Sequence, residues 1–188
     1  YTLSLHDALP ILRLMAAMVA VHSLQYVITL LFLSVQFIRD SEMLFIDVLL
    51  SYNRRITIGV FYRPPGSDTK PLEDLQTFIQ GLDSTADLIL VGDFNLPEIE
   101  WSCITNRALQ QSLNHALLID IIQDNFLTQL VSEPTRNHNI LYLLITTSPD
   151  IIDRLVVGDC FSDYNSLSFE ILRSPYTQRK SRKCFNSY

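Results

Sequence analysis

The chain has 188 residues, of which 48% are hydrophobic and 18% are charged, so it is long enough for one well-packed domain and too short for two. Five glycines and three cysteines exclude collagen-like and disulfide-scaffold proteins, and the hydrophobic fraction excludes a wholly disordered chain. The mean hydropathy of +0.19 is high beside a net charge of −6. Either part of the chain is membrane-like, or part of it is not native sequence.

The charge is unevenly distributed. Residues 1–172 carry nine Lys and Arg against all twenty Asp and Glu, a net charge of −11, whereas residues 173–188 carry five basic residues and no acid. An acidic body argues against binding of nucleic acid over the whole surface. We interpret the basic tail, 173–188, as a solvated segment, with contact to phosphate as the alternative. The three cysteines are widely spaced and indicate free thiols of a reducing compartment.

The first 38 residues account for most of the positive hydropathy. Residues 1–11, YTLSLHDALPI, match the translation of a sequencing-library adapter, and we interpret them as a fusion scar. Residues 12–38 form an apolar segment, and 14–38 lack Lys, Arg, Asp and Glu altogether. At ~1.5 Å per residue, a helix of this length would span a bilayer. The alternatives are buried strands, which its Val, Ile and Tyr content also suits, and frame-shifted coding sequence.

After this segment the pattern is that of an α/β domain over residues 39–172. In chain order it predicts two strands joined as a hairpin at 44–50 and 55–62, a helix at 70–82, a buried strand at 87–95 and a helix at 106–125. Three further apolar runs follow at 139–147, 153–159 and 166–172.

The stretch 86–101, ADLILVGDFNLPEIEW, is the most informative part of the chain. Its apolar strand delivers Asp93 and Asn95 to the carboxyl edge, where an extended backbone would point both side chains the same way. A carboxylate beside an amide suits phosphodiester cleavage, because Asp93 can deprotonate a water while Asn95 donates a hydrogen bond without adding charge. A simple strand end followed by a turn is the alternative.

Five motifs in order sharpen this interpretation: VFYRPPGSD, LILVGDFNLPEIEW, LVSEPTR, NILYLLITTSPD and FSDYNSLSFEI. Together they resemble the endonuclease/exonuclease/phosphatase superfamily, specifically the endonuclease domain of LINE-type non-LTR retrotransposons, over about residues 39–172. The resemblance implies an α/β fold, a sandwich of two β-sheets flanked by helices, whose N-terminal part is missing here. It also implies Mg²⁺-dependent nicking of DNA and a nuclear or cytoplasmic location, or a membrane location if 14–38 form a helix.

Residue by residue, the resemblance assigns roles to five positions. Tyr62 matches the tyrosine that hydrogen-bonds the scissile phosphate, and Asp93 and Asn95 match the catalytic acid and its amide partner. Thr135 falls where the family places a DNA-contacting hydroxyl. Asp163 matches the aspartate that orients the catalytic histidine in the family's SDH motif.

The chain departs from the family at positions that matter for catalysis. Tyr142 stands where the NILD motif has an active-site aspartate, and Tyr164 stands where SDH has its histidine. Tyrosine, with a pKa near ~10, is a poor proton shuttle at neutral pH. The family's metal-binding glutamate has no recognisable counterpart; Glu42 is expected to be a surface or structural residue, and the metal ligands stay unknown. We therefore expect little or no nuclease activity.

Other readings remain open. His115 and His138 are expected to be packed or solvated rather than catalytic, and His6 belongs to the adapter match. The alternatives in function are a membrane-anchored interaction protein and a phosphodiesterase or phosphatase for small substrates. Loss of the family's N-terminal strands would leave a sheet edge uncovered and favour aggregation. Nothing in the sequence points to an oligomer.

Overall fold

A computed structural model describes residues 31–49, 54–97, 99, 101, 112–161 and 164–172 of the chain. The strands are β1 (Leu31–Ile38), β2 (Met43–Leu49), β3 (Arg55–Tyr62), β4 (Asp87–Asp93), β5 (Thr128–Gln129), β6 (Tyr142–Thr146), β7 (Ile152–Phe161) and β8 (Tyr164–Ile171). The helices are α2 (Lys70–Gln80) and α3 (Leu113–Asp124), with short 3₁₀ turns at Arg39–Ser41 and Pro149–Ile151.

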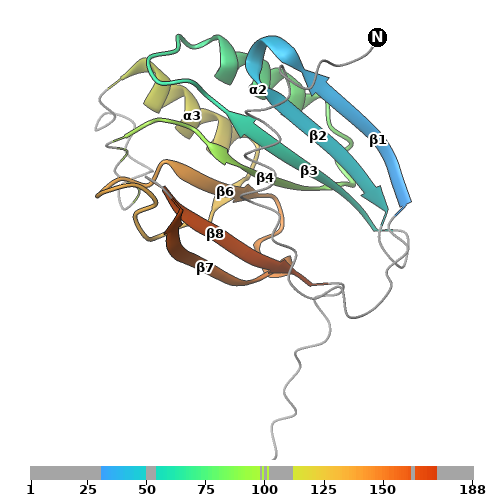
Figure 1. Ribbon diagram of the computed structural model, residues 1–188. Coiled ribbons are helices and arrows are strands. Elements are labelled where there is room, and N and C mark those ends of the chain that lie inside the picture. Colours follow the sequence, from blue (N-terminus) through green and yellow to red (C-terminus); the bar gives the residue numbers. More distant parts are fainter. Residues whose placement is uncertain are drawn as a thin grey trace, which may run out of the picture.

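The strands form two sheets. Six of them make a sheet of order β1-β2-β3-β4-β6-β5, in which only the β3–β4 pair is parallel, and β7 and β8 pair as a separate antiparallel sheet. Helices α2 and α3 lie on one face of the large sheet, and β7 and β8 lie on the other (Figure 1). The α/β sandwich expected from the resemblance is therefore confirmed.

Alternation along the strands builds two cores, one on each face of the large sheet. On β4, Leu88 and Leu90 pack toward the helices, whereas Ile89 and Val91 pack toward the small sheet. The helix-side core includes a stacked pair of rings, Phe45 of β2 and Phe78 of α2, with centroids 3.5 Å apart. A strand buried on both faces reads as a continuous apolar run, which is why β4 is evident in the sequence.

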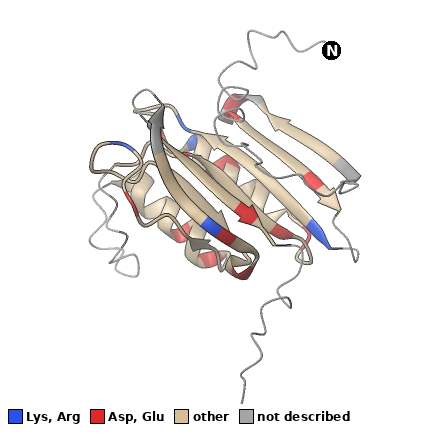
Figure 2. Ribbon diagram, turned by 60° about the horizontal axis from the view of Figure 1, so that its bottom comes forward, with Lys and Arg blue, Asp and Glu red and all other residues tan. Residues whose placement is uncertain are grey.

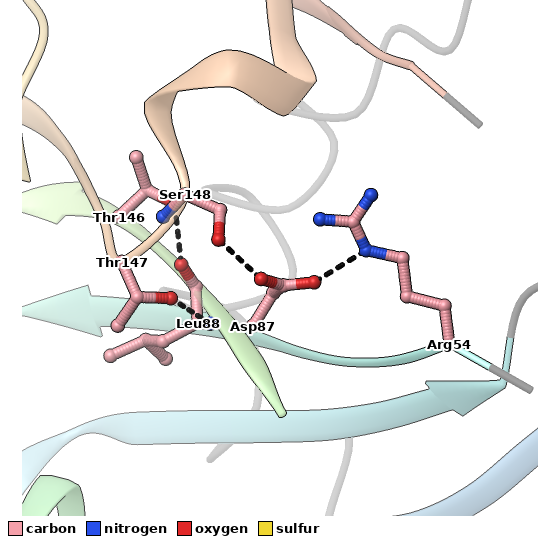
Figure 3. A network of polar contacts seen from close by, with 6 residues as sticks. All are labelled: Arg54, Asp87, Leu88, Thr146, Thr147 and Ser148. Carbon is pink, nitrogen blue, oxygen red and sulfur yellow. Dashed lines mark hydrogen bonds and ion pairs between the residues drawn. The ribbon is translucent and has the colours of Figure 1, made fainter. Parts of the chain in front are cut away.

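Polar contacts hold the amino end of β4 in place. Asp87 accepts from Nε of Arg54 at 2.6 Å and from the Ser148 hydroxyl (Figure 3). Burial raises the pKa of Asp87, but these hydrogen bonds outweigh it and hold the pKa below its ordinary value. The next residue, Leu88, exchanges bonds with Thr146 and Thr147, so three strands are held together where β4 begins. The carboxyl end of β4, at Asp93, lies at the other edge of the sheet.

The apolar segment 14–38 requires a correction. Its described part, Leu31–Ile38, is strand β1, which pairs antiparallel with β2 from Ile38↔Met43 to Leu31↔Leu49. These residues are therefore not part of a transmembrane helix; they form a strand, as the alternative predicted, but none of the side chains described in it is buried. Residues 14–30, like the adapter match at 1–11 and the tail at 173–188, lie outside the described residues. No helix in the described ranges is both long and apolar enough to cross a membrane.

Most of the other predicted elements agree with the structure to within a few residues. The hairpin, the helix after the Pro/Gly loop and the buried strand appear as β2–β3, α2 and β4. The helix expected at 106–125 begins seven residues later than predicted, at Leu113, because the extended Ser112 caps it and its hydroxyl accepts from the His115 N–H. Residues 102–111 lie outside the described part.

Candidate active site

Three adjacent strands bring one residue each to the same rim. Tyr62 ends β3, Asp93 ends β4, and Tyr142 begins β6; Asp93 pairs in register with both tyrosines. Because side chains alternate along a strand, Asp93 shares the face of Ile89 and Val91, and Tyr142 shares that of Leu144. The row formed by Tyr62, Asp93 and Tyr142 therefore lies on the face of the large sheet that the small sheet covers, at the edge of the space between the two sheets.

Asp93 is the buried acid of this row. Only 2% of its surface is exposed, and this burial raises its pKa from 3.8 to about 6. Hydrogen bonds from Asn95 and the positive charge of Arg136 act in the opposite direction. A carboxyl group with a pKa near neutrality can give or take a proton at physiological pH, which is what general acid–base chemistry requires.

Asn95 lies beside Asp93, but by a different route from the one predicted. Strand β4 stops at Asp93, and Asn95 has a left-handed backbone with φ of 45°, so period-two alternation does not extend to it. Its backbone N–H donates to Oδ1 of Asp93 at 3.1 Å, and its side-chain Nδ2 donates to the carbonyl of Arg63 at 2.9 Å. The amide therefore fastens the turn after β4 to the end of β3.

Arg63 is a site residue that sequence reasoning missed. Its side chain is 2% exposed and donates to the carbonyls of Asn95 at 3.4 Å, Ser67 and Asp68. Its own N–H donates to the carbonyl of Asp93 at 2.9 Å. Burial lowers the pKa of the guanidinium, and the charge of Asp68 opposes this. The YRPP motif contains Arg63 but does not indicate what its side chain contacts. The three surrounding carbonyls show that it holds the loop after β3 against the turn after β4.

Thr135 is completely buried, and its hydroxyl serves the backbone. Oγ1 accepts from the N–H groups of Leu141 and Tyr142, both at 2.9 Å, which sets the start of β6. Its carbonyl accepts from the N–H of Asn165 at 2.9 Å, one residue into β8. Thr135 thus joins the two sheets at the rim where the row of Tyr62, Asp93 and Tyr142 lies.

Gly92 explains the close strand packing beneath Asp93. A Cβ atom at this position would lie 1.9 Å from the carbonyl oxygen of Phe61, so no side chain fits between β4 and β3. The glycine of the GDFN motif therefore has a packing role one residue before the acid.

The remaining predicted residues are placed as follows. Asp163 lies outside the described residues, and Tyr164 is described only as the first residue of β8. His115 is buried in α3 and His138 is exposed, in agreement with the packed or solvated roles expected for them. The backbone carbonyl of Glu42 accepts from the N–H of Tyr62 at 3.2 Å, and its side chain is half-buried.

No cluster of metal-ligating side chains occurs among the described residues. Mg²⁺ takes oxygen ligands in octahedral geometry, commonly one or two carboxylates with phosphates and waters. The row contains one carboxylate, Asp93, and tyrosine occupies its register neighbour at 142. No group of three or more His, Cys, Asp or Glu among the described residues could hold a metal ion.

Cavity size does not locate the site. A hollow of about 600 Å³ lies at the end of α3, bordered by Trp101, Phe126 and Val131, and it includes none of the residues of the row. The chemistry at β4, not the volume elsewhere, identifies the candidate site.

One solved structure supports the fold, and two others match it more weakly. The endonuclease domain of TRAS1, a telomere-specific non-LTR retrotransposon, matches with a TM-score of 0.55 and 16% identity, covering 73% of this chain and 68% of that one. The human Nocturnin catalytic domain with bound sulfate matches with a TM-score of 0.47 and 13% identity, covering 74% and 60%. An endonuclease/exonuclease/phosphatase from Beutenbergia cavernae matches with a TM-score of 0.48 and 15% identity, covering 70% and 40%. No curated protein matches by sequence.

Comparison with protein families is decisive for ancestry. The sequence profile described as endonuclease-reverse transcriptase matches residues 56–167, a span that runs from β3 to β8 and contains Tyr62, Asp93 and Tyr142. The chain belongs to the endonuclease-reverse transcriptase family, as its five ordered motifs led us to expect.

Proposed function

We propose that this chain is a retrotransposon-derived endonuclease domain that binds the DNA phosphodiester backbone at the rim of β3, β4 and β6 and has lost most of its ability to cleave it. The observation that carries this proposal is the placement of Asp93, buried and with a pKa of about 6, between Tyr62 and Tyr142. The family match and the fold of the TRAS1 endonuclease domain support DNA as the substrate class.

Part of the chemistry is available at this rim. Asp93 in its ionised form can accept a proton from a water molecule that attacks phosphorus, and near neutral pH both of its protonation states are populated. The neighbouring Tyr62 carries a neutral hydroxyl that can donate to a phosphate oxygen without repelling it. These two groups support binding and activation of water.

The other part of the chemistry is missing. Cleavage also needs a group that stabilises charge on the leaving oxygen, and the family places an aspartate and a histidine where this chain has Tyr142 and Tyr164. A phenol does not readily carry charge at neutral pH. The role of Mg²⁺ in the family would be to stabilise that charge, and the described residues do not offer its ligand set. Loss of a general acid or base alone typically costs ~10²–10⁴ in rate.

A nicking assay on supercoiled plasmid in the presence of Mg²⁺ tests the proposal. The full chain is expected to nick no faster than the Asp93→Ala variant, which defines the background. The double variant Tyr142→Asp, Tyr164→His is expected to stay at that background, because the ligand set would still be incomplete. Robust nicking that Asp93→Ala abolishes would overturn the proposed inactivity, and recovery in the double variant would show that the remaining residues suffice.

A further inference from the structure

The hollow of about 600 Å³ lies beside β5, an outermost strand of the large sheet. Most of its lining residues are apolar, among them Trp101, Phe126 and Leu130, and none belongs to the row at the candidate active site. Among the described residues, β5 pairs with a strand on one side only, which is β6. The hollow therefore combines apolar side chains with an open strand edge, and these are the two features with which proteins bind an extended peptide.

The side chain of Gln129 covers part of this open edge. Leu130 donates its N–H to the carbonyl of Leu144 on β6 at 2.9 Å, so the polar groups of the next residue, Val131, face away from β6. Nε2 of Gln129 donates to the Val131 carbonyl at 2.8 Å, and Oε1 of Gln129 accepts from the Val131 N–H. The main chain of a neighbouring antiparallel strand makes this same pair of bonds to a single residue. The amide of Gln129 therefore takes the place of a peptide.

Phe126 presents an aromatic ring to the same hollow. It is 89% exposed, and it follows Asn125, the C-cap of α3, with a left-handed backbone at φ of 54°. Glycine is the usual residue at this position, because a bulky side chain is strained in this conformation. A strained aromatic residue whose ring stays in water is typical of a contact surface, since binding buries the area that folding leaves exposed.

The chain around the hollow is acidic. Residues 112–135, which include α3 and β5, contain three acidic residues and no Lys or Arg. Two of these acids, Asp124 and Glu133, are exposed and directly follow Gln123 and Ser132, which line the hollow. Figure 2 shows the basic residues of the described chain as isolated positions among more numerous acidic ones. A partner with basic residues beside its apolar ones would therefore be attracted to this edge.

We propose that the edge of β5 binds an extended peptide segment of another protein, in which aromatic or large aliphatic residues are flanked by basic ones. The main chain of the peptide replaces the amide of Gln129 on Val131, and its apolar side chains enter the hollow against Trp101 and Phe126. In the free protein Gln129 protects the edge from pairing with other strands. The inference is independent of the proposed function, because no residue of the row takes part.

The test is fluorescence anisotropy of a labelled ten-residue peptide titrated with the full chain. In this peptide threonine alternates with phenylalanine or valine over six residues, between two pairs of lysines. Binding should slow hydrogen exchange at the Val131 N–H. The same peptide with N-methyl groups on its six central amides should bind at least about tenfold more weakly, because it lacks the donors of a strand. A peptide with glutamate in place of lysine should also bind more weakly.

Two variants should change Kd in opposite directions. Phe126→Gly should raise Kd about tenfold while the free energy of unfolding stays equal or rises, because glycine suits the left-handed backbone. Gln129→Ala should lower Kd about fivefold, because the peptide no longer displaces an amide. Leu113→Ala is the matched control: it shortens a 70% exposed apolar side chain at the other end of α3 and should change Kd by less than about twofold.

Equal binding of the methylated peptide, or an unchanged Kd in Phe126→Gly, would overturn the proposal. Dimers of the full chain that form without peptide and are lost in Phe126→Gly would overturn it by assigning the hollow to a second copy. Peptide binding that requires removal of residues 173–188 would overturn it by assigning the edge to the basic tail of the chain itself.

Discussion

Asp93 places a carboxyl group where the fold disfavours its charge. Its pKa of about 6 in the folded chain compares with an ordinary value of 3.8, so folding takes up a proton between these two values. Stability therefore falls as pH rises from 3.8 through about 6, and above that range the whole cost of burying the carboxylate is present. A shift of this size corresponds to about 3 kcal/mol as an order of magnitude. Burial of this acid lowers stability above pH 6, and acids with pKa values shifted in this way cluster at functional sites.

The variant Asp93→Asn is expected to be more stable than the natural chain above pH 6, by up to about 3 kcal/mol, and to lose this advantage as pH falls toward 3.8. Asparagine keeps an oxygen to accept the N–H of Asn95 and carries no charge. Urea unfolding at a series of pH values measures the effect. Asp124→Asn, which removes an exposed carboxylate at the end of α3, is the control. A gain that is the same at every pH would contradict this account of Asp93.

Arg63 stabilises the rim through geometry more than through charge. Lysine at this position keeps the charge, but its single ammonium cannot reach the carbonyls of both Asn95 and the Ser67–Asp68 loop in the same way. Arg63→Lys is therefore expected to lower the free energy of unfolding by about 2–3 kcal/mol. The matched change Arg55→Lys, in an exposed ion pair with Asp83, should cost less than about 1 kcal/mol. Equal losses in the two variants, measured by chemical denaturation, would show that the buried fork has no special role.

At the scale of elements, the site depends on how the segment before β6 is held. This segment carries Thr135 and Arg136, and it reaches the large sheet at Tyr142 and the small sheet at Asn165. The side-chain amide of Asn165 also donates to the carbonyl of Pro134 at 3.1 Å. The buried hydroxyl of Thr135 thus fixes the segment to the large sheet, and the main-chain carbonyls of Pro134 and Thr135 fix it to the small sheet.

Thr135→Val tests this arrangement, because valine keeps the shape and removes the acceptor. Two buried N–H groups would lose their partner, and the free energy of unfolding should fall by about 3 kcal/mol. Thr135→Ser retains the hydroxyl and should lose about 1 kcal/mol, the value of the missing methyl group. Hydrogen exchange at the amides of Leu141 and Tyr142 should accelerate in the valine variant alone. If valine and serine variants exchange alike, the hydroxyl does not hold this segment.

At the scale of the whole molecule, the predictable parts are those that local pattern determines. Strand β4 is visible because a strand buried on both faces is continuously apolar, and α2 because Pro71 and Gly81 bound it. The apolar run that includes β1 was ambiguous, since a segment without charges satisfies both a membrane helix and a buried strand. The hydrogen bonds of Arg63 could not be predicted from the sequence, because its partners are main-chain carbonyls. Every residue has a main-chain carbonyl, so no residue type indicates which ones the guanidinium contacts.

The place of β1 in the fold leads to a prediction about the domain as a unit. A chain that begins at residue 39 would leave the backbone groups of β2 without the ladder that runs from Ile38↔Met43 to Leu31↔Leu49. A newly exposed strand edge next to the buried Met43 and Phe45 is a template for pairing between molecules. We expect residues 39–172 to elute as aggregates in size exclusion and residues 31–172 to elute as a monomer that melts cooperatively. The two chains differ only in β1, so monomeric behaviour of the shorter one with an unchanged melting temperature would show that β1 is dispensable. If both chains aggregate, another strand edge must cause the association. The first candidate is the outer edge of β1, where Val35 is 63% exposed.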